Sequence, residues 1–301
     1  MITAKTWPII TLVGVSFGYG LLSVGSRWMG QVFGIFTQVY LRIVIALFFM
    51  LIFYFRDIRW RRLLALSIRD WLILILMGTA GYGLMIYAIV QGALLTPLLN
   101  VSVIFSTVPL FVYLLGITFL RRPISFRILL LLFVSIYGVG VLSSGQFFPT
   151  LARFGVGDLW VLISAFFEAI WYLGIRLISN KLNSREITII AQVVAVLTIL
   201  PLALVSGESL PTLADFSSFF VVIGLVIGVV MNVFAPLATI YAFKHLDEVF
   251  ATQLFLSENI FALLVGWFFY GERIGLISLC GAGVVIASVY WMNQTQNQVA
   301  S

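Results

Sequence analysis

The chain has 301 residues, of which 62% are hydrophobic and only 9% are charged, and its mean hydropathy is +1.15. Soluble domains are about a quarter charged, so this chain has too little charge to cover a water-soluble globule. Its hydrophobicity also excludes disorder. The apolar stretches are continuous runs of about 20 residues rather than alternating segments, which predicts an all-α integral membrane protein and not an outer-membrane barrel.

Ten apolar runs follow one another along the chain, most of them long enough to cross a hydrocarbon core about 30 Å thick. The first run is too long for a signal-peptide core and no convincing cleavage site follows it, so we expect a retained helix. The connections are short and leave no room for a soluble domain. The predicted spans are residues 7–26, 35–55, 70–91, 98–120, 126–144, 156–178, 187–206, 217–243, 249–270 and 274–292.

The basic residues predict the orientation. With a cytoplasmic N-terminus, thirteen of the 17 fall on the cytoplasmic side, among them Lys5 and the cluster from Arg56 to Arg62. This bias predicts a multi-pass protein of the cell inner (plasma) membrane with both termini in the cytoplasm. The basic cluster is interpreted as a topology determinant that touches anionic lipid, and no nucleic-acid partner is expected.

The two halves of the chain resemble each other. Tyr87-Ala88 ends the third span and Tyr241-Ala242 ends the eighth, while Ile124 and Ile274 precede the fifth and tenth spans. This predicts an N-terminal repeat over residues 1–145 and a C-terminal repeat over 155–293, with five helices each. Because five is odd, the second repeat must be inverted in the membrane. Inverted repeats are typical of secondary transporters, which place the substrate site near the midplane between the repeats.

Short motifs recur along the chain in a fixed order. They are Phe17-Gly18-Tyr19-Gly20, Leu41-Arg42-Ile43, Gly78-Thr79-Ala80, Tyr87-Ala88, Thr107-Val108-Pro109, Ser164-Ala165 with Trp171, Gly271-Glu272-Arg273-Ile274 and Gly281-Ala282-Gly283. In these motifs the chain resembles the drug/metabolite transporter superfamily, specifically the ten-helix exporters of the EamA type. It departs from their pattern at Arg121-Arg122-Pro123, where a Gly-Glu-Arg turn is usual, and at Asn259, where proline is usual and a kink would be expected.

Three ionisable residues fall inside predicted spans, where each costs roughly 2.5–3.5 kcal/mol on insertion scales. Glu168 shares a helix face with Trp171 and Tyr172, so it can bind a cationic amine, bind a proton, or make a structural hydrogen bond. Glu258 is interpreted equally as a coupling residue or a structural one. Arg42 is expected to order the bundle, by pairing with Glu258 or Glu168, or to bind a substrate carboxylate.

Uncharged polar residues also gather inside the spans, outside the fifth and tenth. Each alone is more often a hydrogen-bonding contact between helices than a ligand contact. The resemblance implies that the fifth and tenth spans are peripheral and that the other eight line the cavity. Glycine pairs at i, i+4 spacing favour close helix packing, in a monomer or a weak homodimer. The candidate substrate-binding residues are Glu168, Trp171, Tyr172, Tyr82, Asn100, Asn232 and Gln253, chosen from a wider set that also includes Tyr19, Gln192 and Asn259.

Signals for catalysis are weak. Gly14-Val15-Ser16-Phe17-Gly18 matches a nucleophile elbow only by letters, since it falls inside a helix. No nucleotide-binding or metal-binding motif is present, so neither a cofactor nor a metal is expected. We therefore expect a secondary transporter that exports a small polar or amphipathic metabolite by alternating access. Amino acids or related amines are the first hypothesis for its substrate and protons are a possible partner. The alternatives are a membrane scaffold and a membrane-embedded enzyme.

Overall fold

The computed structural model describes residues 6–208, 211–271 and 273–300, so Lys5 and Glu272 lie outside the described residues. Regular structure in the described part is helical throughout, with ten helices apolar and long enough to cross a membrane. The predicted all-α, ten-span fold is therefore confirmed. The spans are Thr6–Met29, Ile35–Asp57, Ile68–Leu95, Leu98–Leu120, Phe126–Ser144, Val156–Ile178, Ser184–Val205, Phe219–Phe243, Glu248–Tyr270 and Leu276–Gln296.

Seven of these spans are continuous helices and three are interrupted. The continuous spans correspond to α1 (Thr6–Met29), α2 (Ile35–Tyr54), α8 (Phe126–Ser144), α9 (Val156–Ile178), α10 (Ser184–Val205), α11 (Phe219–Phe243) and α14 (Leu276–Ala300). The interrupted spans are α4 (Ile68–Gly78) with α5 (Met85–Leu95), α6 (Leu98–Phe105) with α7 (Val108–Leu120), and α12 (Glu248–Phe255) with α13 (Ser257–Tyr270). A short helix, α3 (Trp60–Leu64), lies between the second and third spans.

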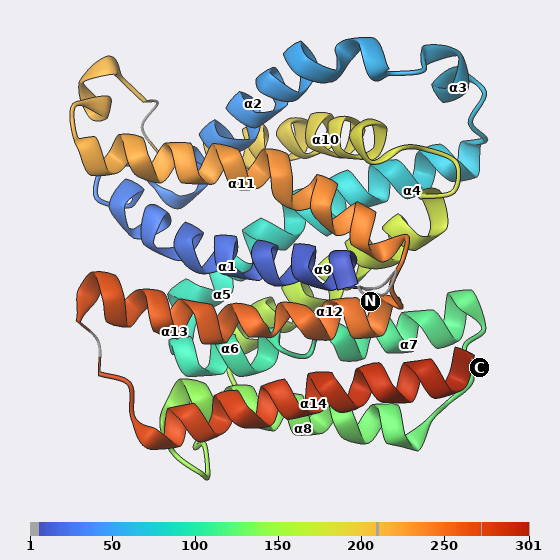
Figure 1. Ribbon diagram of the computed structural model, residues 1–301. Helices are drawn as coiled ribbons and strands as arrows, with labels where there is room; N and C mark the ends of the chain where they lie inside the picture. The colour runs from blue at the N-terminus through green and yellow to red at the C-terminus, as the bar shows by residue number, and fades with distance from the viewer. Residues whose placement is uncertain (1–5, 209–210, 272, 301) are drawn as a thin grey trace.

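The last helix is longer than the sequence predicts. It continues past Met292 to Ala300, because no glycine or proline follows Gly283 to stop it. Figure 1 shows the start of α1, the end of α14 and the short helix α3 at the right of the bundle. We call this the terminal end and the opposite one the far end.

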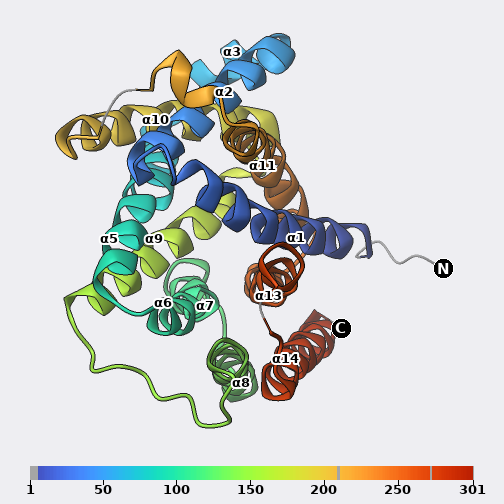
Figure 2. The ribbon, with the colours of Figure 1, turned by 90° about the vertical axis from the view of Figure 1, so that its left-hand side faces the viewer.

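Helices of the first half of the chain pack in pairs against helices of the second half. Helix α1 packs against α11 and α13, and its counterpart α9 packs against α5, α6 and α7. Helices α2 and α10 pack together, as do α8 and α14, which lie at the lower edge in Figure 2. Corresponding helices of the two halves thus have corresponding partners in the opposite half, which agrees with the predicted inverted repeat.

Glycines allow the closest helix contacts inside the chain. A Cβ atom at Gly224 of α11 would lie 2.5 Å from the carbonyl oxygen of Gly25 in α1. In the same way, Gly281 of α14 packs against the backbone of α8, where a Cβ atom would lie 2.7 Å from the Cα of Leu142. Gly224 therefore serves packing within one chain.

Polar contacts tie the halves together at both ends of the bundle. Near the terminal end, Arg59 donates from Nε and Nη2 to the Glu186 carboxylate at 3.0 and 2.8 Å, and this hydrogen bonding raises the pKa of the Arg59 guanidinium. At the far end, Glu208 accepts hydrogen bonds from the backbone N–H groups of Phe36 and Thr37 at the start of α2. A carboxylate there satisfies free N–H groups and complements the helix dipole.

Substitution of Gly281 tests the α8–α14 contact. Gly281→Ala places a methyl group against backbone atoms of α8, so we expect it to lower the unfolding free energy by about 1–3 kcal/mol. Gly283→Ala is the matched control, since nothing lies within 4 Å of a Cβ atom there. Thermal unfolding in detergent, followed by tryptophan fluorescence, compares the two variants. An equal effect of both would contradict the contact.

Candidate functional site

Two cavities lie among the central helices, with a third and smaller space, which we call the passage, beside them. The acidic cavity, of about 280 Å³, is lined by Glu168 and Glu258 together with aromatic and small polar side chains. The arginine cavity, of about 210 Å³, is lined by Arg42, Tyr82 and Asn232 among others. A passage of about 40 Å³ shares residues with both cavities, and Tyr19 lines all three spaces. Described residues of α8 and α14 line none of them, as expected for peripheral helices.

Glu168 of α9 has one oxygen engaged and one free. Its Oε1 accepts a hydrogen bond from the Tyr172 hydroxyl one turn later, at 2.7 Å. Its Oε2 is buried and has no hydrogen-bond partner among the described residues. Tyr172 is itself fixed by stacking on Phe243 and Phe255, with ring centroids 5.1 and 5.6 Å away. Because buried polar atoms are normally paired, the free oxygen indicates a place for a donor that the described residues do not supply.

Glu258 reaches the same cavity from α13, in the first turn of that helix. The positive end of the helix dipole favours a carboxylate at this position. Within the described chain, neither Glu168 nor Glu258 is ion-paired with a basic side chain. Arg42 therefore pairs with neither of them, contrary to one of the expectations from the sequence.

The breaks in the fourth and ninth spans both border the acidic cavity. In the fourth span, the Ser106 and Thr107 hydroxyls donate to the carbonyls of Val103 and Ile104, each at 2.6 Å. In the ninth, the Ser257 hydroxyl donates to the Leu254 carbonyl at 2.6 Å. Asn259, which stands in place of the usual proline, donates to the Leu256 carbonyl at 3.2 Å. Side chains thus satisfy carbonyls near each break, and the ninth span is interrupted without a proline.

The third and eighth spans are distorted where they border the passage. Residues Thr79–Leu84 form a π-helical segment, a feature that is frequent at functional sites. Its Gly81 packs on the backbone of Trp171, where a Cβ atom would lie 3.0 Å from the Trp171 Cα. The eighth span has Pro236 inside α11, and Pro236 lines the same passage. The two distortions therefore meet beside Glu168.

Arg42 of α2 is 7% exposed and lines the arginine cavity. Its Nε donates to the Gln38 carbonyl at 3.1 Å, and its Nη1 donates to the Ser26 hydroxyl at 2.9 Å. Across the cavity, the Tyr82 hydroxyl donates to Asn232 Oδ1 at 2.6 Å. Asn232 in turn donates to the Gly228 carbonyl at 2.8 Å, so its side chain is fixed in place.

The structure brings together five of the seven predicted substrate-binding residues. Glu168, Trp171, Tyr172, Tyr82 and Asn232 line the cavities or the passage. The other two do not line these spaces and make contacts between helices and loops elsewhere.

Asn100 donates to Asp158 Oδ1 at 2.8 Å and accepts from the Ala152 N–H at 3.1 Å. Gln253 points toward α8 and α14, with its Nε2 atom 3.3 Å from the Ser288 hydroxyl. Tyr19, Phe105 and Phe255 line the acidic cavity but were not predicted as site residues. Of these, Tyr19 carried a signal, as a polar residue inside a span.

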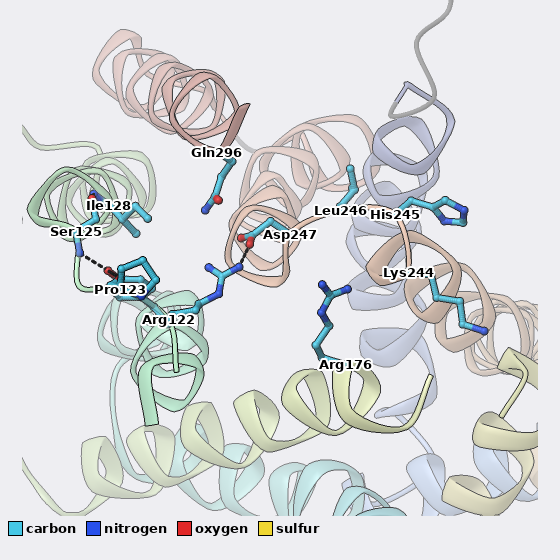
Figure 3. Close-up of a pocket in the computed structure, with 11 residues that line it drawn as sticks. Arg122, Pro123, Ser125, Ile128, Arg176, Lys244, His245, Leu246, Asp247 and Gln296 are labelled. Atoms are coloured by element: carbon cyan, nitrogen blue, oxygen red, sulfur yellow. Dashed lines mark hydrogen bonds and ion pairs between the residues drawn. The ribbon is translucent and has the colours of Figure 1, made fainter. Parts of the chain in front are cut away.

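A cluster of charges lies at the terminal end, and we call it the terminal ion network. Arg122, just after α7, forms an ion pair with Asp247, and its Nε lies 2.8 Å from Glu248 Oε1. Arg176 of α9 lies 3.8 Å from Glu248 Oε2. Figure 3 shows Arg122 reaching Asp247 while Arg176 points into the same space. The network thus joins the two halves of the chain.

A cleft of about 430 Å³ opens beside this network at the terminal end. Burial, together with the charge of Arg59, lowers the pKa of the Lys244 ammonium group that lines the cleft. Between the cleft and the acidic cavity lies the main hydrophobic core, which includes the buried Val112, Phe243 and Phe250. The acidic cavity instead extends toward the far end along Ile89, Val101 and Ser102.

Cysteine labelling tests which end of the bundle reaches the acidic cavity. Cys280, the only cysteine, is first replaced by alanine. We expect Ser102→Cys, which lines the cavity, to react with a membrane-impermeant thiol reagent at least roughly tenfold faster than Ser164→Cys, because reactivity follows access. Ser164 is fully buried and serves as the matched control. Labelling from the side of the termini, located by protease cleavage of a C-terminal tag, would contradict the far-end opening.

Comparisons with known proteins agree with this architecture. A crystal structure with 13% sequence identity superposes with a TM-score of 0.76 over 99% of both chains, which shows a shared fold. A protein of Archaeoglobus fulgidus named "Uncharacterized transporter" is 27% identical over 245 residues, covering 79% of this chain and 82% of that protein. The sequence model of the EamA-like transporter family matches residues 6–144 and again residues 155–294. The chain therefore belongs to the EamA-like transporter family and is a membrane transporter.

Proposed function

We propose that the protein exports a small metabolite that carries a protonated amine, with amino acids and related amines as its substrate class. The observation that carries this proposal is the buried Oε2 atom of Glu168, which has no hydrogen-bond partner among the described residues. Glu168 lines the acidic cavity. A substrate ammonium group supplies the missing donor and the opposite charge. Hydrogen bonds to charged groups are among the strongest that proteins make.

The walls of the acidic cavity suit such a substrate. Tyr19, Phe105, Tyr172 and Phe255 present aromatic side chains beside the two carboxylates. Aromatic faces attract cations and also hold apolar substituents of an amphipathic amine. With about 280 Å³ the cavity lies just below the range of about 300–1,000 Å³ that is usual for drug-sized ligands, so a small metabolite fits best.

The difference between the two ends of the bundle supports transport by alternating access. The cavities extend toward the far end, and the hydrophobic core and the terminal ion network close the other end. In the alternative state, Arg122 separates from Asp247 and Glu248, and the far-end contacts close. Corresponding helices of the two halves pack against corresponding partners, and this symmetry supports two related states, each open at one end.

The basic residues support the direction of transport. The start of α1, the end of α14 and α3 with its arginines lie at one end of the bundle. An excess of basic residues is typical of the cytoplasmic side. In the plasma membrane, the described state is then open to the outside. Substrate binds from the cytoplasm after the terminal ion network opens.

Protons are the proposed coupling ion. Glu168 and Glu258 have no basic partner in the described chain, so a proton is the alternative to a cationic substrate for neutralising each carboxylate. Exchange of a proton for the amine at Glu168 gives antiport.

Substitution of Glu168 tests the substrate site. In proteoliposomes, Glu168→Gln is expected to reduce uptake of the amines and amino acids that the wild type transports by roughly tenfold or more, because the amide loses the charge that binds the ammonium group. Substrates are first chosen by thermal-shift screening, since a ligand that binds the folded form raises its apparent stability. Asp215→Asn, on the loop before α11, is the control for removal of a carboxylate outside the cavities. Unchanged transport by Glu168→Gln would rule out this site.

An imposed pH gradient tests coupling in the same vesicles. Substrate uptake is expected to rise when the lumen is acidic, because outward proton flow drives inward amine movement, and the rise should be absent in Glu168→Gln. Uptake that ignores both pH and membrane potential would remove the proton role of Glu168 and leave its role in substrate binding.

The terminal ion network has its own test. Arg122→Gln breaks the contacts with Asp247 and Glu248, so we expect it to favour opening of the terminal end and to increase labelling of Tyr113→Cys from that side severalfold. Arg121→Gln is the matched control, since the neighbouring Arg121 is exposed and takes no part in the network. Equal labelling in both backgrounds would show that the network does not hold this end closed.

A further inference from the structure

The arginine cavity is lined by a cation that forms no ion pair within the described part of the chain. Arg42 lies in a membrane-spanning helix and is 7% exposed, and its two described hydrogen bonds go to neutral oxygens of Gln38 and Ser26. No carboxylate of the described chain forms an ion pair with it. Charged groups inside a membrane are ordinarily paired, and an intramembrane ionisable residue without a partner indicates a ligand.

Arg42 is also held in place. Its side chain passes over Gly228 of α11, where a Cβ atom would overlap Arg42 Cδ and lie 2.6 Å from its Cγ. The hydrogen bonds from Nε and Nη1 fix the orientation of the guanidinium. A planar guanidinium presents paired donors that match a carboxylate, and the Nη2 amino group has no described hydrogen bond.

The two cavities adjoin each other. Tyr19 lines both, and the passage is lined by Tyr82 of the arginine cavity and by Glu168 of the acidic cavity. Arg42 and Glu168 bind different neighbours, so the described chain leaves a cation and a carboxylate without ion pairs in adjoining cavities. A ligand with one charge neutralises only one of them, whereas a zwitterion neutralises both.

We infer that the arginine cavity is a carboxylate subsite, in which Arg42 binds the carboxylate of a zwitterionic substrate whose ammonium group lies at Glu168. This inference rests on the proposed function and narrows its substrate class from amines in general to amino acids. Tyr82 and Asn232, fixed by their mutual hydrogen bond, form the opposite wall of the subsite.

Paired ligands test the subsite. Each pair contains an amino acid and the amine that lacks its carboxylate, namely L-phenylalanine with 2-phenylethylamine, and 6-aminohexanoate with pentylamine. Binding to the full-length protein in detergent is measured by thermal shift and by competition. For at least one pair, the wild type is expected to bind the amino acid roughly tenfold more tightly than the amine. Arg42→Gln is expected to abolish this preference while changing amine affinity less than about twofold.

Two further variants separate ligand binding from structural order. Gly228→Ala keeps the charge of Arg42 but displaces its side chain, so it should also reduce the preference for the amino acid. Arg42→Lys keeps a cation but not the planar donor pair, and should retain part of the preference. A purely structural Arg42 would lower the melting temperature and weaken both members of a pair equally, and that result would overturn the subsite.

The outcomes distinguish this inference from the proposed function. The wild type could bind the amines at least as tightly as the amino acids, while Glu168→Gln loses amine binding. That result overturns the carboxylate subsite and leaves the amine site intact. Binding of neither member of either pair overturns both. A preference for amino acids that persists in Arg42→Gln assigns the carboxylate to another group and overturns the role of Arg42.

Discussion

The hydrocarbon core of a membrane offers no water, so each polar group within it must find a partner in the protein or in a ligand. This constraint explains where the chain departs from regular helix. The fourth and ninth spans break at Ser106 and Leu256, beside the acidic cavity, and nearby hydroxyl and amide side chains bind carbonyl groups there. The same constraint makes Arg42 and Glu168 conspicuous, because each has capacity for a partner that the described chain does not fill.

The number of spans was predictable because hydropathy measures the physical property that places a helix in a membrane. The breaks within spans were less predictable. Proline marks only one cause of a break, and in the ninth span Ser257 and Asn259 accompany a break without proline. The π-helical segment at Thr79–Leu84 depends on close packing of Gly81 against Trp171, which is a tertiary contact and leaves no local signature beyond glycine.

Some residues of the candidate site could be identified from the sequence and others could not. Glu168 and Arg42 could be selected from the sequence, because a charge inside an apolar span is rare. Asn100 and Gln253 could not be separated from Tyr82 and Asn232, since an uncharged polar residue serves equally well in contacts between helices. The terminal ion network was missed because its charges lie at span ends, where basic residues were interpreted as determinants of orientation. Only the fold shows that Arg122 reaches Asp247 and Glu248 from the other half of the chain.

The terminal ion network affects how readily solute leaks across the membrane through the transporter. In the proposed mechanism, opening the terminal end separates Arg122 from two carboxylates, and an empty cavity provides no new contact that offsets the loss. A bound solute shifts the balance between states only through contacts that differ between them. The unloaded protein then changes state slowly and the loaded one faster, so the membrane stays tight to the solute when none is available in the cytoplasm. Four charged residues that lie far from the substrate thereby help to maintain its concentration gradient across the membrane.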